Sequence, residues 1–589
     1  MREIVEQGIE RTAGLLMEKV EGTPQGNAHW EGSLSDSALS TSLAVLALSM
    51  GGSERHDSLI QGGLRWLRES QNADGGWGDT LTSLSNFSTS LLVWCALSYG
   101  GEGERNTSTW STLQDYLTRQ AGGVTPEEIV QKVLAHYGED KTFSAPILST
   151  CALAGCIGPP KEAWDRVPQL PFEIASLPHG LLRLCRLPVV SYAIPALIAV
   201  GLVAFRGKGE RGFPAFLRRS VTPRCLRVLE ECQPENGGFL EAIPLTSFVV
   251  LSLIGAGESS HPVVQKGLRF LEKSARFRTS WPIDTHLATW VTTSAVTAFS
   301  IMKDRSYLEK TGRESLLKWI LSQQFTARHP FTGAAPGGWA WTPLPGGVPD
   351  ADDTSGALVA LHHLAGRDPE TRSAAEGGIR WLIGLQNRDG GIPTFCRGWG
   401  RLPFDRSCPD ITAHAIKALN LWLPDMPTVL AVPVKNSLRK ASLYLQRTQD
   451  EKGSWIPLWF GNENTQDHTN PTYGTSKVIL GCPQLPGVER GRSFLAGIQN
   501  KDGGWGGGLG TPSSIEETAL AIQALSGCPH QYGSALEQGL LWLKDVTRNF
   551  QSFPASPIGL YFSSLWYAEE LYPILFTLEA LGRLDENLV

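Results

Sequence analysis

The 589-residue sequence has no excess of basic residues: 52 Lys and Arg stand against 58 Asp and Glu, for a net charge of −6. This balance gives no electrostatic basis for binding nucleic acid, which we exclude as a partner. The ten cysteines lack the paired spacing of a metal site, because the nearest approach, Cys396 and Cys408, has no matching second pair. We interpret them as free thiols in a reducing compartment. The stretch Met1–Glu6 is typical of an amphipathic helix, so we expect no signal peptide.

Long hydrophobic runs are also missing. The longest, Val189–Phe205, is interrupted by Pro195 and Gly201 and is shorter than the ~20 residues of a membrane-spanning helix, so it predicts a buried core helix. Strand signals are few, which favours an all-α fold. What the sequence does have is hydrophobic residues (41%) and 19 tryptophans, which predict large cores, more than one domain and an aromatic-rich interior or cavity.

A repeated turn is the strongest organisational signal. Each copy begins with Gln and contains Gly, and most copies end in Trp; the copies are Gln71–Trp77, Gln233–Phe239, Gln323 or Gln324 to Trp339, Gln386–Ile392, Gln449–Trp455 and Gln499–Trp505. An amphipathic helix precedes each copy and an apolar helix follows it. The unit is therefore helix, Gly-rich turn, helix, with glycine supplying the positive φ that such a turn requires. Plain turn formation and core packing account for these residues.

Three carboxylates cluster in Asp350-Ala351-Asp352-Asp353-Thr354, directly before an apolar helical segment. Their mutual repulsion makes at least one of them hold its proton more strongly than an isolated Asp. Such a cluster can hold a divalent cation, present one strong acid, or simply cap the helix. The residues alone leave these three interpretations open.

Together, the Gln-x-x-x-Gly-x-Trp repeat and the Asp-x-Asp-Asp-Thr motif resemble the squalene-hopene cyclase family of class II terpene cyclases, over most of the chain. The resemblance implies two α/α barrels, one inserted near the start of the other. It places residues 1–19 in an N-terminal helix of the catalytic barrel, residues 20–284 in the inserted barrel and residues 285–589 in the catalytic barrel. The substrate cavity is then expected between the barrels.

The resemblance also implies roles for the polar residues. Asp352 matches the family's proton donor, and Asp350 and Asp353 match its supporting carboxylates. Asp410 and His414, in Asp410-Ile411-Thr412-Ala413-His414, resemble the family's Asp-x-x-x-His element and lie four apart, on one face of a helix. We therefore expect a cationic His414, held by Asp410, that donates to Asp352.

Further family positions concern water and aromatic side chains. Tyr473 matches a tyrosine that orders water behind the acid. Trp290, Trp341 and Trp459 match aromatic residues that line the cavity, where ring faces stabilise carbocations without supplying a nucleophile. The C-terminal aromatic cluster resembles the family's cavity-lining tail; its members are Tyr561, Phe562, Trp566, Tyr567 and Tyr572. Ordinary core packing is the alternative for every one of these aromatic residues.

Three departures from the family pattern stand out. Val291 replaces the Asp that usually follows the tryptophan, the last repeat is degraded at Asp545–Phe550, and an additional polar loop, Asn462–Asn470, precedes Tyr473. The loop is in a position to reshape the end of the cavity where the reaction begins.

The resemblance therefore predicts a cyclase that protonates a terminal alkene of squalene and forms a hopene-like polycyclic triterpene. A class II cyclase of a shorter isoprenoid diphosphate, such as a copalyl-type diterpene precursor, is the alternative; its substrate requires clustered Lys or Arg, usually with Mg2+. A non-catalytic α/α-barrel binding protein, like a protein prenyltransferase β subunit, is a third possibility. That relative needs an Asp/Cys/His zinc set, which the sequence does not supply, and the Asp-Asp-x-x-Asp motif of class I cyclases is also missing.

For the squalene reaction we expect no metal and no cofactor. The resemblance implies monotopic or peripheral contact with a membrane, on its cytoplasmic face, and the segment Leu177–Phe205 is the expected mouth of the substrate channel. The oligomeric state stays open, with a homodimer as one option.

Overall fold

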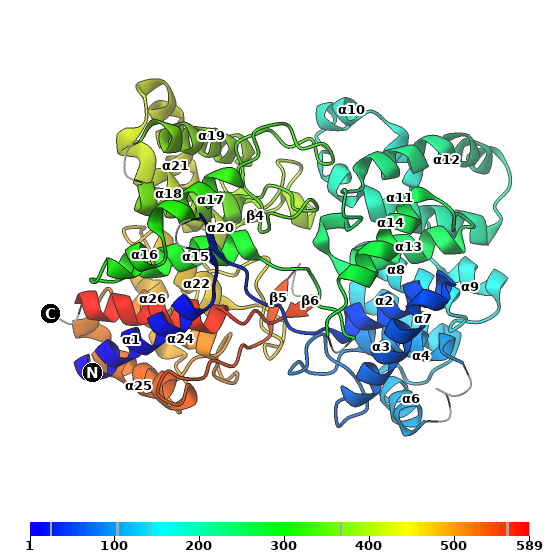
Figure 1. Ribbon diagram of the computed structural model, residues 1–589, viewed down its shortest axis with the longest axis horizontal. Coiled ribbons are helices and arrows are strands. Elements are labelled where there is room, and N and C mark those ends of the chain that lie inside the picture. The colour runs from blue at the N-terminus through cyan, green and yellow to red at the C-terminus, as the bar shows by residue number, and fades with distance from the viewer. Residues whose placement is uncertain are drawn as a thin grey trace.

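The computed structural model describes residues 1–23, 26–101, 105, 107–138, 141–277, 279–365, 368–560 and 565–587. It consists of two helical halves that lie side by side (Figure 1). The chain begins and ends in the same half, and the other half is inserted between Trp30 and Ile283, as the blue α1 and red α26 in Figure 1 make visible. The predicted all-α fold with two α/α barrels is confirmed.

The inserted half has an inner ring of helices that are buried on nearly all sides. Neighbours in the ring pack against each other in the order α2, α4, α8, α11, α13 and back to α2. Their bounds are α2 Ala38–Met50, α4 Phe87–Tyr99, α8 Lys141–Leu153, α11 Val189–Lys208 and α13 Ile243–Gly255. The helices around them are α3 Asp57–Glu69, α6 Ser108–Ala121, α7 Pro126–Tyr137, α9 Pro160–Arg166, α10 His179–Leu184, α12 Phe213–Cys232 and α14 Pro262–Lys273. Helices that are apolar on every face can be stable only when surrounded in this way.

The second half repeats this plan with six inner helices in a closed ring, within the described part of the chain. In ring order they are α15 Ala288–Ile301, α18 Ala351–Ala365, α20 Pro409–Trp422, α22 Pro471–Gly481, α24 Ile515–Leu525 and α26 Tyr572–Asn587. The helices outside them are α1 Arg2–Glu18, α16 Ser306–Lys310, α17 Arg313–Ser322, α19 Pro369–Leu385, α21 Thr428–Thr448, α23 Val488–Gly497 and α25 Pro529–Val546. Helix α1 packs on α26, on the outside of this barrel.

Short strands and 3-10 turns connect the helices. The antiparallel strand pairs are β1 Val20–Thr23 with β2 Gly26–Trp30, β3 Ile392–Pro393 with β4 Ser407–Cys408, and β5 Ile558–Leu560 with β6 Leu565–Tyr567. The 3-10 turns are η1 Glu54–His56, η2 Phe172–Ser176, η3 Phe239–Glu241, η4 Pro403–Asp405 and η5 Leu423–Asp425. Strand β2 joins the second barrel, because the Trp30 backbone N–H donates to Thr292 Oγ1 (2.9 Å).

Each barrel has its own hydrophobic core. One core gathers apolar residues from Ala38 to Trp281 together with Phe331, Val348 and Cys396, and the other gathers the remaining core residues of Val5–Leu34 and Ile283–Leu584. The side chains of Trp341, Phe395 and Phe404 pack against both cores and so join the two barrels. This division follows the predicted plan of one barrel inserted in the other, while the domain boundaries themselves stay a prediction.

The repeated turns tie outer helices to one another. In the copy at Gln499, the Gln Nε2 donates to Gly503 O within the turn and to Ala535 O in α25. The Trp505 indole N–H donates to Leu495 O, at the end of the preceding helix (2.7 Å), and so satisfies a carbonyl that the helix end leaves free. Gly503 has φ +95°, and a Cβ there would lie 2.8 Å from Gln538 O, so only glycine fits.

The stretched copy and one overlooked copy use the same bonds. Gln324, not Gln323, donates to Gly337 O and Ala374 O, which decides between the two predicted starting points. Trp281 donates to Leu271 O like the other repeat tryptophans, although its turn lacks the Gln and Gly that the sequence pattern requires. Turn and packing roles thus account for the repeats, as predicted.

The predicted core helix is α11. It is long and apolar enough to cross a membrane by length and composition, and of the helices in the described part of the chain it alone meets that test. Its 20 residues, with Pro195 inside, exceed the predicted run Val189–Phe205, and most of the helix is buried in the inner ring of the inserted barrel.

Candidate active site

The acid motif begins inner helix α18 of the second barrel. Asp350 Oδ1 accepts hydrogen bonds from the backbone N–H groups of Asp352 and Asp353, each 2.9 Å long. The Ala351 N–H donates to Thr394 O (2.8 Å). Asp350 therefore does cap the helix, as one of the three interpretations held, and its own side chain fixes the direction of the next two carboxyl groups.

Burial governs the two flanking carboxyl groups. It raises the pKa of Asp350 to about 7 and raises the pKa of Asp353 well above its ordinary value. The charge of Asp350 adds to the effect of burial on Asp353, and Asp350 Oδ2 and Asp353 Oδ1, both buried, have no hydrogen-bond partner within the described residues. Two carboxyl groups that are buried and close together do not both ionise readily, which limits the negative charge beside Asp352.

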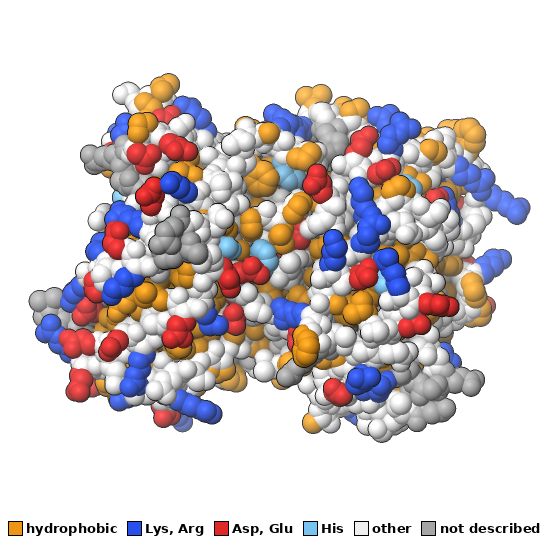
Figure 2. Space-filling view, in the orientation of Figure 1, with side chains coloured by type: hydrophobic (Ala, Val, Ile, Leu, Met, Phe, Trp, Pro, Cys, Tyr) orange, Lys and Arg blue, Asp and Glu red, His pale blue; other side chains and the backbone are white. Residues whose placement is uncertain are grey.

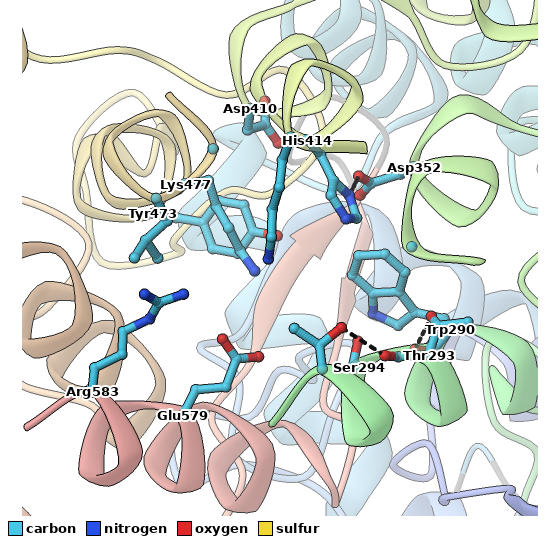
Figure 3. Close-up of a pocket in the computed structure, with 15 residues that line it drawn as sticks. Trp290, Thr293, Ser294, Asp352, Asp410, His414, Tyr473, Lys477, Glu579 and Arg583 are labelled. Carbon is cyan, nitrogen blue, oxygen red and sulfur yellow. Dashed lines mark hydrogen bonds and ion pairs between the residues drawn. The ribbon is translucent and has the colours of Figure 1, made fainter. Parts of the chain in front are cut away.

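Asp352 points away from this pair, toward the neighbouring inner helix α20. Its Oδ1 lies 2.6 Å from His414 Nδ1, and the two side chains keep 15% and 23% of their surface exposed (Figure 3). The edge of the Trp290 ring faces the imidazole at 6.1 Å between centroids. The predicted contact between His414 and Asp352 is therefore present.

The predicted bond between Asp410 and His414 is wrong. Both residues lie on α20, but Asp410 Oδ1 accepts from Cys408 Sγ (2.6 Å), and no bond to His414 occurs among the described residues. Cys408 Sγ in turn accepts the Leu458 N–H (3.2 Å). Burial raises the pKa of Asp410 to about 6. Spacing of four residues places two side chains on one helix face, yet Asp410 is at the first turn, where the preceding Cys408 is closer at hand.

Tyr473 lies on the first turn of α22, buried beside the acid. Its ring stacks on Phe460 at 4.6 Å, and Lys477 Nζ lies 5.4 Å from the ring centre. Burial, followed by the charges of Asp352 and Asp410, raises the pKa of the Tyr473 phenol well above its ordinary value. The hydroxyl therefore stays protonated and can donate or accept a hydrogen bond without becoming a competing base.

A cavity of about 70 Å3 joins these residues inside the second barrel. Its lining includes Trp290, Asp352, Asp410, His414 and Tyr473, and Figure 3 shows their side chains converging from α15, α18, α20 and α22. This space holds a few water molecules and is too small for an isoprenoid chain. It suits the predicted role of Tyr473 in ordering water behind the acid, a role that stays a prediction.

Sequence reasoning missed four charged residues of this cavity: Lys417, Lys477, Glu579 and Arg583. Burial lowers the pKa of Lys417 to about 8, against the opposing effect of Glu579. Helical spacing was the available signal, because Lys417 is three residues after His414 and Lys477 is four after Tyr473.

The predicted aromatic residues lie between the acid and the interface of the barrels. Trp341 accepts the Trp290 N–H through its carbonyl (3.3 Å), and its ring meets the Phe395 edge at 6.3 Å. Trp459 meets Phe395 at 5.8 Å and Phe404 at 6.1 Å. The structure thus brings Trp290, Trp341 and Trp459 together and adds Phe395 and Phe404, which the sequence analysis did not single out. We call Trp341, Phe395, Phe404 and Trp459 the aromatic cluster.

Part of the C-terminal tail lies near the acid: burial raises the pKa of the Tyr567 phenol, and the charges of Glu569, Asp352 and Asp353 add to this effect. The hydroxyls of Tyr567 and Tyr572 bond to each other (2.9 Å).

Trp566 and the additional loop lie elsewhere. Trp566 is buried in β6, where its backbone N–H donates to Asp79 Oδ2 (2.9 Å) and its ring faces His468 of the loop 462–470. The same loop binds Glu517 through Asn462 and Asn470. These bonds join the loop to the tail and to α24, and none of those described reaches the acid.

Two further predictions concern Phe562 and Val291. Phe562, like Tyr561, lies outside the described residues. Val291 is buried in α15, and Thr293 and Ser294 from the same helix line the cavity, so polar groups enter it two and three residues beyond the missing Asp.

Within the described ranges, no group of three or more His, Cys, Asp and Glu side chains is arranged to hold a metal ion. The expectation that the reaction uses no cofactor stays a prediction.

Comparison with known proteins yields a family match over half of the chain. Residues 287–585 match the model of the squalene-hopene cyclase C-terminal domain. A terpene cyclase-glycosyl transferase fusion protein, fsoA, from Humicola fuscoatra is 29% identical over 62% of this chain, and the match covers 31% of that protein. A second relative, the enfumafungin synthase efuA from Hormonema carpetanum, is covered over 43% of its length. This chain therefore spans less than half the length of these two relatives.

Two other relatives cover nearly the whole chain. A squalene-hopene cyclase of Bradyrhizobium diazoefficiens is 23% identical over 92% of this chain and 88% of its own. The solved structure of ent-copalyl diphosphate synthase from Streptomyces platensis superposes with a TM-score of 0.55 over 98% of this chain and 99% of its own, at 18% identity. That structural likeness supports the fold.

Proposed function

Because the chain belongs to the squalene-hopene cyclase family of class II terpene cyclases, we propose that Asp352 protonates a terminal double bond of an isoprenoid and so begins its cyclisation. One observation supports this proposal above the others. Among the described contacts, the Asp352 carboxyl alone of the three in its motif meets a histidine, through the 2.6 Å approach of His414 Nδ1, and it keeps some exposure beside Trp290. An alkene is a weak base, so it needs an acid of this kind in surroundings with little water.

The proton balance of the step is simple. The Asp352 carboxyl gives its proton to one alkene carbon, and the other carbon becomes a tertiary carbocation. Further double bonds attack in turn, and loss of a proton or capture of water ends the reaction. The Asp352 carboxylate left behind is stabilised by His414, and the polar cavity around Tyr473 supplies a route by which a proton returns.

The aromatic residues stabilise the positive charge while it moves. Trp290 contacts His414, and the aromatic cluster continues from Trp341 toward the interface of the barrels. A ring face stabilises a nearby cation by about 0.5–2 kcal/mol and offers no lone pair that captures it. Several such rings along the path favour ring closure over quenching.

Two substrates are candidates. The family resemblance favours squalene, with a hopene-like polycyclic triterpene as product. A specific structural observation favours a second candidate, an isoprenoid diphosphate: a cavity lined by arginines opens next to the aromatic cluster. The two candidates share the same acid and the same first step.

Membrane contact is part of the proposal. Hydrophobic side chains lie along the upper edge of the molecule in Figure 2, over α10, α12 and the start of α21. They include Leu184 (81% exposed), Phe213 (78%) and Val429 (74%). Such side chains suit an interfacial contact through which a water-insoluble substrate enters. Of the segment Leu177–Phe205, α10 supplies the exposed part, and most of α11 is buried.

The experiment compares detergent-solubilised wild type and Asp352→Asn, each incubated with squalene and with geranylgeranyl diphosphate. Products are read by gas chromatography–mass spectrometry, after phosphatase treatment in the second case. We expect a cyclic product from one substrate with wild type, and none with Asp352→Asn, because the amide has no acidic proton to give. The melting temperature of the variant should stay close to that of wild type. Wild-type turnover by Asp352→Asn would refute the proposed acid.

A further inference from the structure

A cavity of about 1020 Å3 lies between the barrels and is strongly basic. Four chain segments line it: residues 183–192 of the inserted barrel, and residues 328–335, 380–389 and 395–401 of the second barrel. The arginines that these segments contribute are Arg183, Arg186, Arg328, Arg388, Arg397 and Arg401, with Arg380 as a seventh. Among the lining residues the one acidic side chain is Asp389.

Most of this positive charge has no charged partner among the residues that the structure describes. Arg183 and Arg328 both donate to the same carbonyl, Gly333 O. Arg380 lies 3.7 Å from Glu376. The side chains of the other four, Arg186, Arg388, Arg397 and Arg401, make no hydrogen bond or ion pair within the described part of the chain, so their guanidinium groups are available to a ligand.

The one lining carboxylate does not neutralise the arginines. Asp389 Oδ1 accepts hydrogen bonds from the Gly391 N–H (3.0 Å) and from Ser407 Oγ (2.9 Å), which hold it in the turn that precedes β3. A single carboxylate held in this way is a poor Mg2+ site, since that ion is bound through carboxylates together with the phosphate oxygens. The guanidinium groups themselves are therefore the groups that would meet an anion.

The basic cavity is joined to the acid by direct contacts. Phe395 lines the cavity, and its ring touches Trp341 and Trp459. The preceding residue, Thr394, accepts the Ala351 N–H in the acid motif itself. The segment Thr394–Phe395 thus places the lining of the basic cavity next to both the aromatic cluster and the acid motif.

We propose that the arginine-lined cavity binds the diphosphate group of a linear isoprenoid substrate and directs the opposite, hydrocarbon end toward Asp352. This inference rests on the proposed function, because it assigns the substrate class of that same acid. Guanidinium groups bind phosphate oxygens in pairs and remain charged at every working pH, so several of them from both barrels form a clamp without a metal ion. Squalene carries no group that this clamp would hold.

Binding is tested first, with inorganic pyrophosphate as the probe. Calorimetry is run with EDTA on wild type, on the double variant Arg388→Gln/Arg401→Gln and on Arg439→Gln as a matched control. Arg439 is an exposed arginine of α21 outside this cavity. We expect pyrophosphate to bind wild type and Arg439→Gln equally, and at least tenfold more weakly to the double variant. Equal binding to all three proteins, or none to wild type, would overturn the proposal.

Kinetics then connect the site to the reaction. With geranylgeranyl diphosphate, the double variant should raise KM at least tenfold while Arg439→Gln leaves it unchanged. Asp352→Asn should lose turnover yet bind pyrophosphate like wild type, which separates the two proposals. Turnover of squalene alone, without pyrophosphate binding, would overturn this inference and leave the proposed acid intact. Turnover by Asp352→Asn would refute the proposed acid. The arginine-lined cavity would then still be tested by whether pyrophosphate binds.

A membrane phosphate is the other source of the same chemistry. Vesicles of phosphatidylcholine, with and without phosphatidylglycerol, are therefore mixed with wild type and with the double variant. We expect the double substitution to leave vesicle binding unchanged. If it abolishes binding to the anionic vesicles while pyrophosphate does not bind, the cavity holds a lipid headgroup and the proposal is wrong.

Discussion

Asp410 is a buried carboxyl group, and its burial predicts a pH-dependent cost to stability. Its folded-state pKa is about 6, whereas an Asp in an unfolded chain has a pKa of about 3.9. Between these values the unfolded state is the more ionised, so the folded state loses stability as the pH rises through this window. Asp410→Asn keeps an oxygen that accepts from Cys408 but has no charge, so its free energy of unfolding should not fall as the pH rises through this window.

The magnitude follows from the two pKa values. A difference of about two units corresponds to about 3 kcal/mol once it is fully developed, at about 1.4 kcal/mol per unit. Linkage places about 1.4 kcal/mol of this between pH 5 and pH 8, because part of the cost is already present at pH 5. The stability of Asp410→Asn relative to wild type, measured as the difference in their free energies of unfolding, should therefore be about 1.4 kcal/mol greater at pH 8 than at pH 5.

The assay is urea unfolding followed by tryptophan fluorescence at both pH values. Asp368→Asn is the matched control, because Asp368 caps α19 through the Thr371 N–H (2.9 Å) and these hydrogen bonds lower its pKa. An acid with a lowered pKa contributes stability that is lost only as the pH falls below about 4, so this control should show no change between pH 5 and pH 8. If Asp410→Asn behaves like the control, the Asp410 carboxyl is not held in a dry environment, and our account of the site is refuted.

Two other buried groups, one titratable and one a hydrogen-bond donor, also give predictions about stability. Burial lowers the pKa of Lys417 to about 8, so the folded state loses stability as the pH falls from about 10.4 toward 8. Lys417→Met removes this loss. In urea unfolding it should be more stable than wild type by up to about 3 kcal/mol at pH 7 and by less than about 1 kcal/mol at pH 10. An advantage that does not change with pH would show that packing, not charge, is responsible. Trp505→Phe removes the donor to Leu495 O and should cost about 1–3 kcal/mol of unfolding free energy. Trp399→Phe, at a position that is 59% exposed, should cost little in the same assay, and equal losses in both variants would contradict the assigned role of the indole bond.

The fold was predictable because its determinants are local and repeated. The Gln, Gly and Trp of each turn mark the end of an outer helix, and the helices that follow are apolar on all faces. The copy at Trp281 was not predicted, because its hydrogen bond to Leu271 O needs only the indole N–H and the turn before it contains neither Gln nor Gly. A sequence pattern therefore identifies the repeats that contain Gln, Gly and Trp together, and it misses a turn that makes the indole bond without the other two residues.

The site was predictable to the level of which residues meet, but not how they pair. The spacing of Asp410 and His414 fixes the helix face that they share, while the choice of partner depends on side-chain rotation and on neighbours from other segments. Cys408 lies just two residues before Asp410, yet no pattern marks it as a donor. The arginine-lined cavity was hidden for a related reason: four separate segments build it, and no single segment is conspicuously basic.

The placement of charge about the aromatic cluster has a consequence for substrate orientation. A carbocation is stabilised near Asp352 and the indole rings, whereas the arginines repel it. Cyclisation is therefore favoured at the acid end and disfavoured at the basic end. The two ends of squalene are identical, so a hydrocarbon of that kind gains nothing from this polarity. An isoprenoid with an anionic group at one end gains a defined direction, because its charge binds the arginines and its hydrocarbon end is then directed toward Asp352.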